Sequence, residues 1–337
     1  MTKKDRIETF SKLGDWMLNL NPETQLAIES IQNKNPWYTK ENILKQFNAL
    51  GQNLNSQKLE AWTANYEATE SSKKVGLVLA GNIPLVGFHD ILSTLIMGFT
   101  AHIKVSSDDA GLTTLVLNHV IKIDPRFQDK IQLADKLSDF DLVIATGSNN
   151  TARYFEYYFG KKPHIIRKNR NSIAVLTGNE SKEQLSQLGD DIFDYFGLGC
   201  RSVSKIFIPQ GYDISPFFES IEHYKWISDH YKYNNNYDYN KSIYLVNRDK
   251  HYDNGFLLLK QDENIASPLA VVFYQEYTAL HEVEDYINSR KDSVQCVTSI
   301  AALQIDSPLF DLGQSQCPAL DDYADGVDTL HFLADNQ

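Results

Sequence analysis

Cysteine is scarce in this chain. Only three occur among 337 residues, Cys200, Cys296 and Cys317, an odd number at wide spacing. Such cysteines do not suit a disulfide framework, and a reducing compartment, the cytoplasm, is the expected setting. Cys296 lies in a strand-like run and is expected in the core, whereas Cys317 lies in an irregular segment. Cys-x-x-Cys and His-Glu-x-x-His motifs are absent, and no metal site is expected.

Long apolar runs are also missing. No window approaches the roughly 20 apolar residues that span a bilayer. The most apolar region, 75–103, is interrupted by glycine, asparagine, proline, histidine and aspartate. The N-terminus begins Met-Thr-Lys-Lys-Asp and then runs polar, unlike a signal peptide. We therefore expect neither an integral membrane segment nor a secretory leader.

Positive charge is in deficit, because 32 Lys and Arg stand against 44 Asp and Glu, a formal net charge of −12. This balance repels phosphate backbones and anionic lipid, so neither nucleic acid nor a membrane surface is an expected main partner. Walker loops and Gly-x-Ser-x-Gly elbows are absent as well. The hydrophobic share of 42% is ample for a buried core, and the length suggests about two domains.

Strands are expected to alternate with helices through the first half, after a helical N-terminus of about 70 residues. The patterns predict strands at Val75–Ala80, Ala101–Val105, Lys130–Ala134 and Leu142–Ala145, and helices at Leu85–Met97 and Gly111–Val120. This alternation implies an α/β fold with a parallel sheet and crossover helices. Ligands of such sheets bind beyond the carboxyl ends of the strands. The turns Gly81-Asn82 and Thr146-Gly147-Ser148 both follow such an end.

The second half is expected to start near Asn179. An amphipathic helix is predicted over Ser181–Phe196, with a capping-box pattern formed by Ser181 and Gln184. Strands are predicted at Val203–Ile208, Ile243–Val246, Leu269–Tyr274 and Ser293–Ser299.

Cys200 is the first candidate for chemistry, because it follows the glycine-rich connection Gly197-Leu198-Gly199. Such a connection lets a ligand approach the backbone closely and keeps the thiol out of packed helices. The nucleophile is the thiolate, whose pKa falls beside cations, and Arg201 and Lys205 are the local candidates. A structural cysteine at this place is the alternative reading.

Asn82 is the second candidate. A side-chain amide held rigidly in a turn can donate a hydrogen bond to an oxyanion. The alternative is that asparagine and glycine simply form a turn here.

The order of these motifs resembles the aldehyde dehydrogenase superfamily, and within it the LuxC-type acyl-CoA reductases. The resemblance covers about residues 73 to 330 and rests on Gly81-Asn82-Ile83-Pro84-Leu85, Gly98, Lys104, Thr146-Gly147-Ser148, Gly199-Cys200 and the closing run 316–330. It implies a Rossmann-type cofactor lobe with a helical N-terminus over 1–178 and an α/β catalytic lobe over 179–315. The C-terminal segment 316–337 is expected to pack back on the cofactor lobe.

The resemblance also implies roles for individual residues. Cys200 would accept the acyl group, and Asn82 with the Cys200 backbone N–H would form an oxyanion hole. Lys104 would contact the adenosine ribose or its phosphate. The rest of the implied cofactor site comprises Gly81, Ser107, Thr146, Gly147 and Ser148.

Three departures from the family pattern bear on the chemistry. Arg167 occupies the place of the glutamate that activates water in hydrolytic members, so hydrolysis of an acyl-enzyme should be slow. Asn264 replaces a glutamate that grips the nicotinamide ribose. Ser106-Ser107, with Asp108 next along, stands where the family often has an acid that favours NAD. The loss of that acid leans toward NADPH, with NADH still possible. The basic run Arg167, Lys168 and Arg170 would either steer coenzyme A phosphates or form a solvated loop.

The implied activity is reduction of acyl-CoA, or of another acyl thioester, to an aldehyde through a Cys200 acyl-enzyme. Three alternatives remain: a CoA-acylating aldehyde dehydrogenase running in reverse, an acyltransferase or thioesterase without hydride transfer, and a non-catalytic binding module. Homo-oligomers are usual among the proteins that the chain resembles, and a protein that transfers or activates acyl groups is a further conceivable partner. Four aromatic residues would line an acyl tunnel or, alternatively, belong to the core: Phe88, Phe193, Tyr195 and Phe196.

Overall fold

The computed structural model describes all 337 residues, which form two compact units. The first unit comprises Met1–Asn169 together with Ala319–Gln337, and the second comprises Arg170–Pro318. None of the helices combines the length and the apolar character that crossing a bilayer requires. The two units are described in turn.

Four helices open the first unit, and each begins at a polar residue that caps it. They are α1 (Lys3–Leu18), α2 (Pro22–Lys34), α3 (Lys40–Asn53) and α4 (Ser56–Trp62). The caps Thr2, Asn21, Thr39 and Asn55 each accept a hydrogen bond from a backbone N–H of the first turn. The predicted helical N-terminus is confirmed.

A five-stranded sheet follows, and all of its strands are parallel. Its strands are β1 (Lys74–Val78), β2 (Thr100–Lys104), β3 (Ile131–Leu133), β4 (Leu142–Thr146) and β5 (His164–Arg167). The connecting helices are α5 (Phe88–Ile96), α6 (Leu112–Ile123) and α7 (Asn149–Phe159). The spatial order is β3-β2-β1-β4-β5. The strand order reverses between β1 and β4, and a crevice for a ligand is expected beyond the carboxyl ends at that point.

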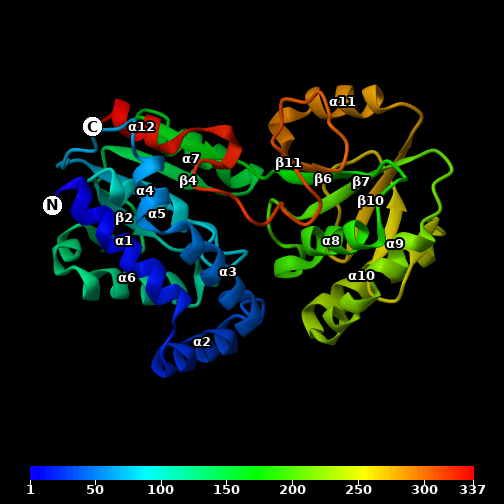
Figure 1. Ribbon diagram of the computed structural model, residues 1–337, viewed down its shortest axis with the longest axis horizontal. Coiled ribbons are helices and arrows are strands. Elements are labelled where there is room, and N and C mark those ends of the chain that lie inside the picture. The colour runs from blue at the N-terminus through cyan, green and yellow to red at the C-terminus, as the bar shows by residue number, and fades with distance from the viewer. The chain divides into compact units, whose positions relative to one another are not determined.

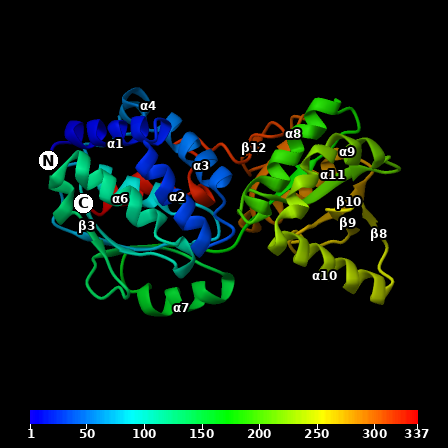
Figure 2. The same ribbon diagram turned by 90° about the horizontal axis from the view of Figure 1, so that it is seen from below.

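Helices cover both faces of this sheet, with α7 on the face opposite α1 and α6 (Figure 2). Leu142 and Ile144 of β4 face the core that contains α5, whereas Val143 and Ala145 face Phe155 of α7. This alternation is the period of two expected of a strand buried on both sides.

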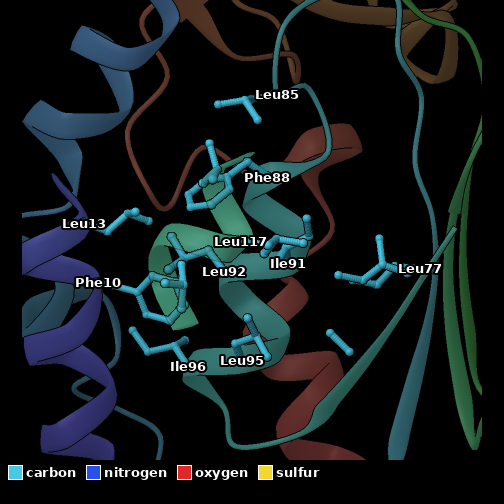
Figure 3. Packing of buried hydrophobic residues seen from close by; sticks show 14 of the residues in the cluster. Phe10, Leu13, Leu77, Leu85, Phe88, Ile91, Leu92, Leu95, Ile96 and Leu117 are labelled. Atoms are coloured by element: carbon cyan, nitrogen blue, oxygen red, sulfur yellow. The ribbon is translucent and has the colours of Figure 1, made fainter. Parts of the chain in front are cut away.

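Helix α5 lies at the centre of the larger core. All of its residues except His89 are buried. Figure 3 shows its side chains packed against those of α1, α6 and β1; the labelled residues are Phe10, Leu13, Leu77, Leu85, Phe88, Ile91, Leu92, Leu95, Ile96 and Leu117. The C-terminal helix α12 (Thr329–Asp335) adds Leu330 and Leu333 to the same core. Each fully buried side chain of this size contributes about 1.5–3 kcal/mol.

The second unit is built on a seven-stranded sheet of order β12-β11-β6-β7-β10-β9-β8. Its strands are β6 (Asn171–Val175), β7 (Val203–Pro209), β8 (His251–Asp253), β9 (Leu258–Gln261), β10 (Val271–Tyr277), β11 (Val294–Ser299) and β12 (Leu309–Phe310). Only β8 is antiparallel to its neighbour. One face carries α11 (Leu280–Asn288), and the other carries α8 (Lys182–Phe193), α9 (Ser215–Ser220) and α10 (Tyr231–Asn247), as Figure 1 shows. The α/β prediction is confirmed for both units.

One predicted strand is wrong. Ile243–Val246 forms the last turn of helix α10. A run of four apolar residues does not distinguish a strand from a buried helical turn. The segment is helical because one side of it is buried. The buried residues recur at helical spacing: Tyr233, Tyr237, Asn240 and Tyr244.

The helix predicted over Ser181–Phe196 is shorter than expected. Its capping box, formed by Ser181 and Gln184, is present, but α8 ends at Phe193. Tyr195 and Phe196 then adopt left-handed backbone angles, with φ of 52° and 60°. Both side chains are buried, as the helical pattern in the sequence requires, but the backbone is no longer helical at these two residues.

Candidate active site

The loop after β1 carries Gly81 and Asn82. Gly81 is buried and packs against the next loop, since a Cβ added to it would lie 2.6 Å from the Cβ of Ser106. Only glycine fits there, so the loops after β1 and β2 are in direct contact. Asn82 is exposed. The hydroxyl of the buried Tyr38 lies 3.0 Å from the carbonyl oxygens of both Gly81 and Ile83, the residues that flank Asn82.

The loop after β2 presents a lysine and two serines. Lys104 is the last residue of the strand, and its side chain is exposed, as is Ser107. Ser106 begins a short 3-10 turn and accepts a hydrogen bond from the N–H of Asp108 at 3.2 Å. Asp109 is turned inward, where its carboxylate accepts hydrogen bonds from the backbone N–H and the hydroxyl of Thr113. Burial raises the pKa of Asp109.

The loop after β4 leads directly into α7. Thr146 ends the strand, and Ser148 caps the helix by accepting a hydrogen bond from the N–H of Thr151 at 3.2 Å. Gly147 has no room for a side chain, because an added Cβ would lie 2.9 Å from a ring carbon of Phe155. Helix α7 therefore begins directly after a tight loop at the end of β4, and a helix N-terminus in such a place suits an anion.

These three loops lie at one edge of the sheet, because β1, β2 and β4 are adjacent and parallel. The structure thus brings together the residues predicted to hold the cofactor: Gly81, Lys104, Ser107, Thr146, Gly147 and Ser148. Asn82 lies at the same edge. Asn35, at the end of α2, also reaches this edge and donates to the carbonyl oxygen of Asp108 at 2.7 Å. Neither Asn35 nor Tyr38 was marked by any sequence pattern.

Arg167 is buried and does not belong to a solvated basic loop. It is the last residue of β5, and its guanidinium is buried against Asp90 of α5, with 2.5 Å between Nη1 and the carboxylate oxygen. It also donates to the hydroxyl of Thr329 at 3.1 Å. Lys168 instead forms an exposed ion pair with Glu156 at 3.0 Å. The two neighbouring cations therefore have different environments, which local sequence does not distinguish.

Arg170 belongs to the second unit. Its Nη1 lies 3.4 Å from the carbonyl oxygens of Lys291 and Val294, at the start of β11. It supports the local backbone there.

Cys200 lies in an exposed turn between α8 and β7. Its carbonyl oxygen accepts a hydrogen bond from the buried hydroxyl of Ser172 at 3.0 Å. The N–H of Gly199 donates to the hydroxyl of Ser202 at 3.2 Å, and the N–H of Ser202 donates back to the carbonyl of Gly199. The turn that presents the thiol is therefore fixed on both sides of Cys200.

The approach to this turn is unusual. Tyr195, Phe196 and Gly197 all have positive φ, and the first two are bulky residues that rarely adopt it. Backbone of this kind persists only where the surroundings enforce it, and it is frequent at functional sites. Here the rings of Tyr195 and Phe196 are both buried in the core, and this packing holds the backbone of the two residues in place. The sequence pattern, which predicted a continuous helix, missed this feature.

The other two cysteines have the expected environments. Cys296 is buried in β11, 3.1 Å from the hydroxyl oxygen of Ser172, and burial raises the pKa of its thiol to about 11. Its placement in the core is confirmed. Cys317 is exposed in an irregular segment.

Lys205 does not have the environment expected of a cation that assists Cys200. It is fully buried, and its Nζ lies 3.0 Å from the carbonyl oxygens of both Asp262 and Glu263 and 3.4 Å from that of Asn264. Its charge therefore supports the segment that leads from β9 to β10. Burial lowers the pKa of Lys205 to about 8. Arg201 is the cation that remains beside Cys200; its Nη1 lies 3.4 Å from the carbonyl oxygen of Ser315.

The four aromatic residues considered for a tunnel are core residues. Phe88, Phe193, Tyr195 and Phe196 are each at most 3% exposed. A cavity of about 530 Å³ lies elsewhere in the second unit, near β11 and β12, and none of the predicted site residues lines it. Its lining residues are Ser299, Ile300, Ala301, Ala302, Leu309, Phe310, Asp311 and Gln314.

The family model described as acyl-CoA reductase (LuxC) matches residues 10–219. The matched region contains the three loops of the first sheet and the turn that carries Cys200. Among curated proteins, none matches the chain significantly.

Solved structures of aldehyde dehydrogenases share the fold. Betaine aldehyde dehydrogenase from Staphylococcus aureus, solved with NAD+, is 14% identical at a TM-score of 0.64, covering 92% of this chain and 75% of its own. Aldehyde dehydrogenase 21 from Physcomitrella patens, solved with succinate, is 11% identical at a TM-score of 0.70, covering 100% and 84%. An aldehyde dehydrogenase from Mycobacterium tuberculosis, solved with NAD+, is 12% identical at 0.66, covering 93% and 78%.

At such identities the likeness of structures establishes the architecture, while the family match covers more than half of the chain. The chain therefore belongs to the LuxC family of acyl-CoA reductases, which are aldehyde-forming oxidoreductases, and it has the fold of the aldehyde dehydrogenases.

Proposed function

We propose that this protein reduces an acyl-CoA to the corresponding aldehyde at the expense of NADPH, with Cys200 as the acyl acceptor. The observation that carries the proposal is the exposed thiol of Cys200, held in a fixed turn of a chain that belongs to the acyl-CoA reductase family. Family membership supplies the reaction class, and the turn supplies a nucleophile in an accessible position.

The first step forms an acyl-enzyme. The Cys200 thiolate attacks the thioester carbonyl carbon, a new C–S bond forms, and the bond to the coenzyme A sulfur breaks. The carbonyl oxygen becomes an oxyanion, to which the Asn82 amide and the Cys200 backbone N–H are the proposed donors. Coenzyme A leaves as its thiolate and takes up a proton from solvent. Arg201, beside Cys200, is suited to favour the thiolate form of the nucleophile.

When bound, the nicotinamide cofactor supplies the hydride that reduces the acyl-enzyme carbonyl to a thiohemiacetal oxyanion. The same two donors serve this second oxyanion. Its collapse breaks the bond between the carbonyl carbon and the Cys200 sulfur, which releases the aldehyde and restores the thiolate.

The loops of the first sheet suit a dinucleotide. Gly81 and Gly147 allow close approach of the backbone, the N-terminus of α7 suits a pyrophosphate, and Lys104 offers an exposed cation. NADPH is proposed over NADH because Ser106 and Ser107 stand where the family has an acid; Ser107 is exposed, and the exposed Asp108 follows it in the loop. A carboxylate facing the ribose would repel a 2′-phosphate.

Arg167 supports reduction over hydrolysis. It stands in the place of the glutamate that activates water in hydrolytic relatives, and its guanidinium is committed to Asp90. An arginine in an ion pair cannot serve as a general base. The acyl-enzyme should therefore persist until it is reduced.

The test combines mass spectrometry with an assay of NADPH consumption. Incubation with acyl-CoAs of increasing chain length should add the acyl mass to wild-type protein at Cys200 and leave Cys200→Ala unmodified. Cys200→Ala should form no aldehyde and still bind NADPH. Aldehyde formation by Cys200→Ala at the wild-type rate would refute the assignment. Thiol release without NADPH oxidation would identify a thioesterase or transferase instead.

A further inference from the structure

A short segment of the N-terminal region, Asn35–Tyr38, contacts two of the loops described above. It connects α2 to α3, far in sequence from both loops. Tyr38 is 1% exposed, and its hydroxyl lies 3.0 Å from the carbonyl oxygen of Gly81 and 3.0 Å from that of Ile83. These two carbonyls stand immediately before and after Asn82. One buried hydroxyl, which shares its single hydrogen between the two carbonyls, therefore bonds to both ends of the turn that carries Asn82.

Asn35 makes the corresponding contact with the loop after β2. Its Nδ2 donates to the carbonyl oxygen of Asp108 at 2.7 Å, and its Oδ1 accepts from the N–H of Trp37 at 3.1 Å. The second bond fixes the orientation of the amide. Asp108 is next to Ser107, which belongs to the proposed cofactor site. Segment Asn35–Tyr38 thus forms hydrogen bonds with the main chain of both loops.

The contact between Gly81 and Ser106 makes the two loops a single packed group. A displacement of one loop is therefore resisted by the other loop and by segment Asn35–Tyr38. An oxyanion donor is effective only if it is held in place before the charge develops. A misplacement of about 1 Å can cost about 100-fold in rate.

We propose that Tyr38 is a positioning residue for the oxyanion donor Asn82, and that Asn35 is a positioning residue for the cofactor loop that carries Ser107. This inference rests on the proposed function, since it assigns Asn82 its role in acyl transfer. The competing account is that Tyr38 merely satisfies its own buried hydroxyl, as buried tyrosines generally do. The two accounts differ in what the loss of the hydroxyl does to the rate.

The experiment on Tyr38 is a double-mutant cycle with Tyr38→Phe, Asn82→Ala and the double variant, read as the rate of coenzyme A release in a single turnover. Tyr38→Phe keeps the ring and removes only the donor. It should slow acylation by about 10-fold to 100-fold with little change in KM for NADPH. In the Asn82→Ala background the same change should cost almost nothing, because its effect passes through Asn82. Tyr66→Phe is the control, since it removes the hydroxyl of a partly buried tyrosine that bonds to Asp328 at 2.9 Å and to neither loop.

The experiment on Asn35 measures the other loop. Asn35→Ala should raise KM for NADPH several-fold and slow single-turnover acylation by a smaller factor than Tyr38→Phe does. Asn35→Asp keeps the shape of the side chain but has no donor, so it should resemble alanine.

The outcomes separate this inference from the proposed function. Wild-type protein that forms no acyl-enzyme would overturn both. Asn82→Ala at the wild-type rate would overturn Asn82 as the oxyanion donor and, with it, the role of Tyr38. A strongly slowed Asn82→Ala combined with additive effects in the cycle would overturn the role of Tyr38 alone. Equal losses of acylation rate in Tyr38→Phe and Tyr66→Phe would also overturn the role of Tyr38, since they would show that the rate falls because the protein is less stable. An unchanged KM in Asn35→Ala would overturn the role of Asn35.

Discussion

The hydroxyl of Ser172 joins the backbone of Cys200 to the thiol of Cys296. It donates to the Cys200 carbonyl oxygen at 3.0 Å, and its oxygen lies 3.1 Å from the Cys296 sulfur. Because burial raises the pKa of Cys296 to about 11, that thiol stays protonated and can donate to Ser172. A chain of three groups from β6, β11 and the turn that carries Cys200 therefore holds the proposed nucleophile in place.

Replacing Ser172 by alanine should destabilise the protein and loosen the turn. The part-buried Cys200 carbonyl loses its donor and the buried Cys296 thiol loses its acceptor, which together cost about 1–3 kcal/mol. Urea unfolding measures this loss, with Ser72→Ala as the control because Ser72 is exposed. Equal stability of the two variants would contradict the role assigned to the hydrogen bond.

Alkylation should distinguish the cysteines. Iodoacetamide at pH 8 should modify Cys200 and Cys317 in folded protein, since both are exposed, and spare Cys296. The buried thiol of Cys296, with its pKa near 11, should react only after unfolding. Peptide mass spectrometry with and without urea measures the pattern. Modification of Cys296 as fast as Cys200 in folded protein would show that the chain of three groups is open to solvent.

The Asp90–Arg167 pair should matter far more for stability than its neighbour Lys168–Glu156. The first pair is buried and the second is about half exposed. Arg167→Met leaves the Asp90 carboxylate buried without its partner and should cost about 3–5 kcal/mol. Lys168→Met should cost at most about 1 kcal/mol. Denaturant unfolding measures the free energy of unfolding of both variants. Equal losses of that free energy would contradict the burial of Arg167.

Lys205 should make stability rise with pH. Its pKa is lowered to about 8 in the folded state, against 10.5 when exposed, so between these values the unfolded chain binds the additional proton. The free energy of unfolding contributed by this group therefore increases across that window. Comparing wild-type protein with Lys205→Met from pH 7 to pH 10 measures the contribution, with exposed Lys182→Met as the control. A wild-type advantage that shrinks as pH rises would contradict the lowered pKa.

Much of the first sheet could be predicted from the sequence. Strands near β1, β2, β3 and β4 were expected within a few residues of their observed bounds, because each is a short apolar run bounded by turn residues. Strands β5 and β6 were not expected, since their residues lie beside the basic run from Arg167 to Arg170. The strand predicted over Ile243–Val246 was wrong because a short apolar run is ambiguous without its partners.

The sequence by itself determined the alternation of strands and helices, the glycine turns after β1 and β4, and the family to which the motifs point. Only the tertiary structure decided that Arg167 and Lys205 are buried, that Tyr195 and Phe196 leave the helix, and that Tyr38 meets the Asn82 turn. Local patterns arise from neighbours a few residues apart. The environment of a charge or a hydroxyl depends instead on which distant segments pack around it. Arg167 of β5 meets Asp90 of α5, and Tyr38 meets the loop after β1, only in the folded chain.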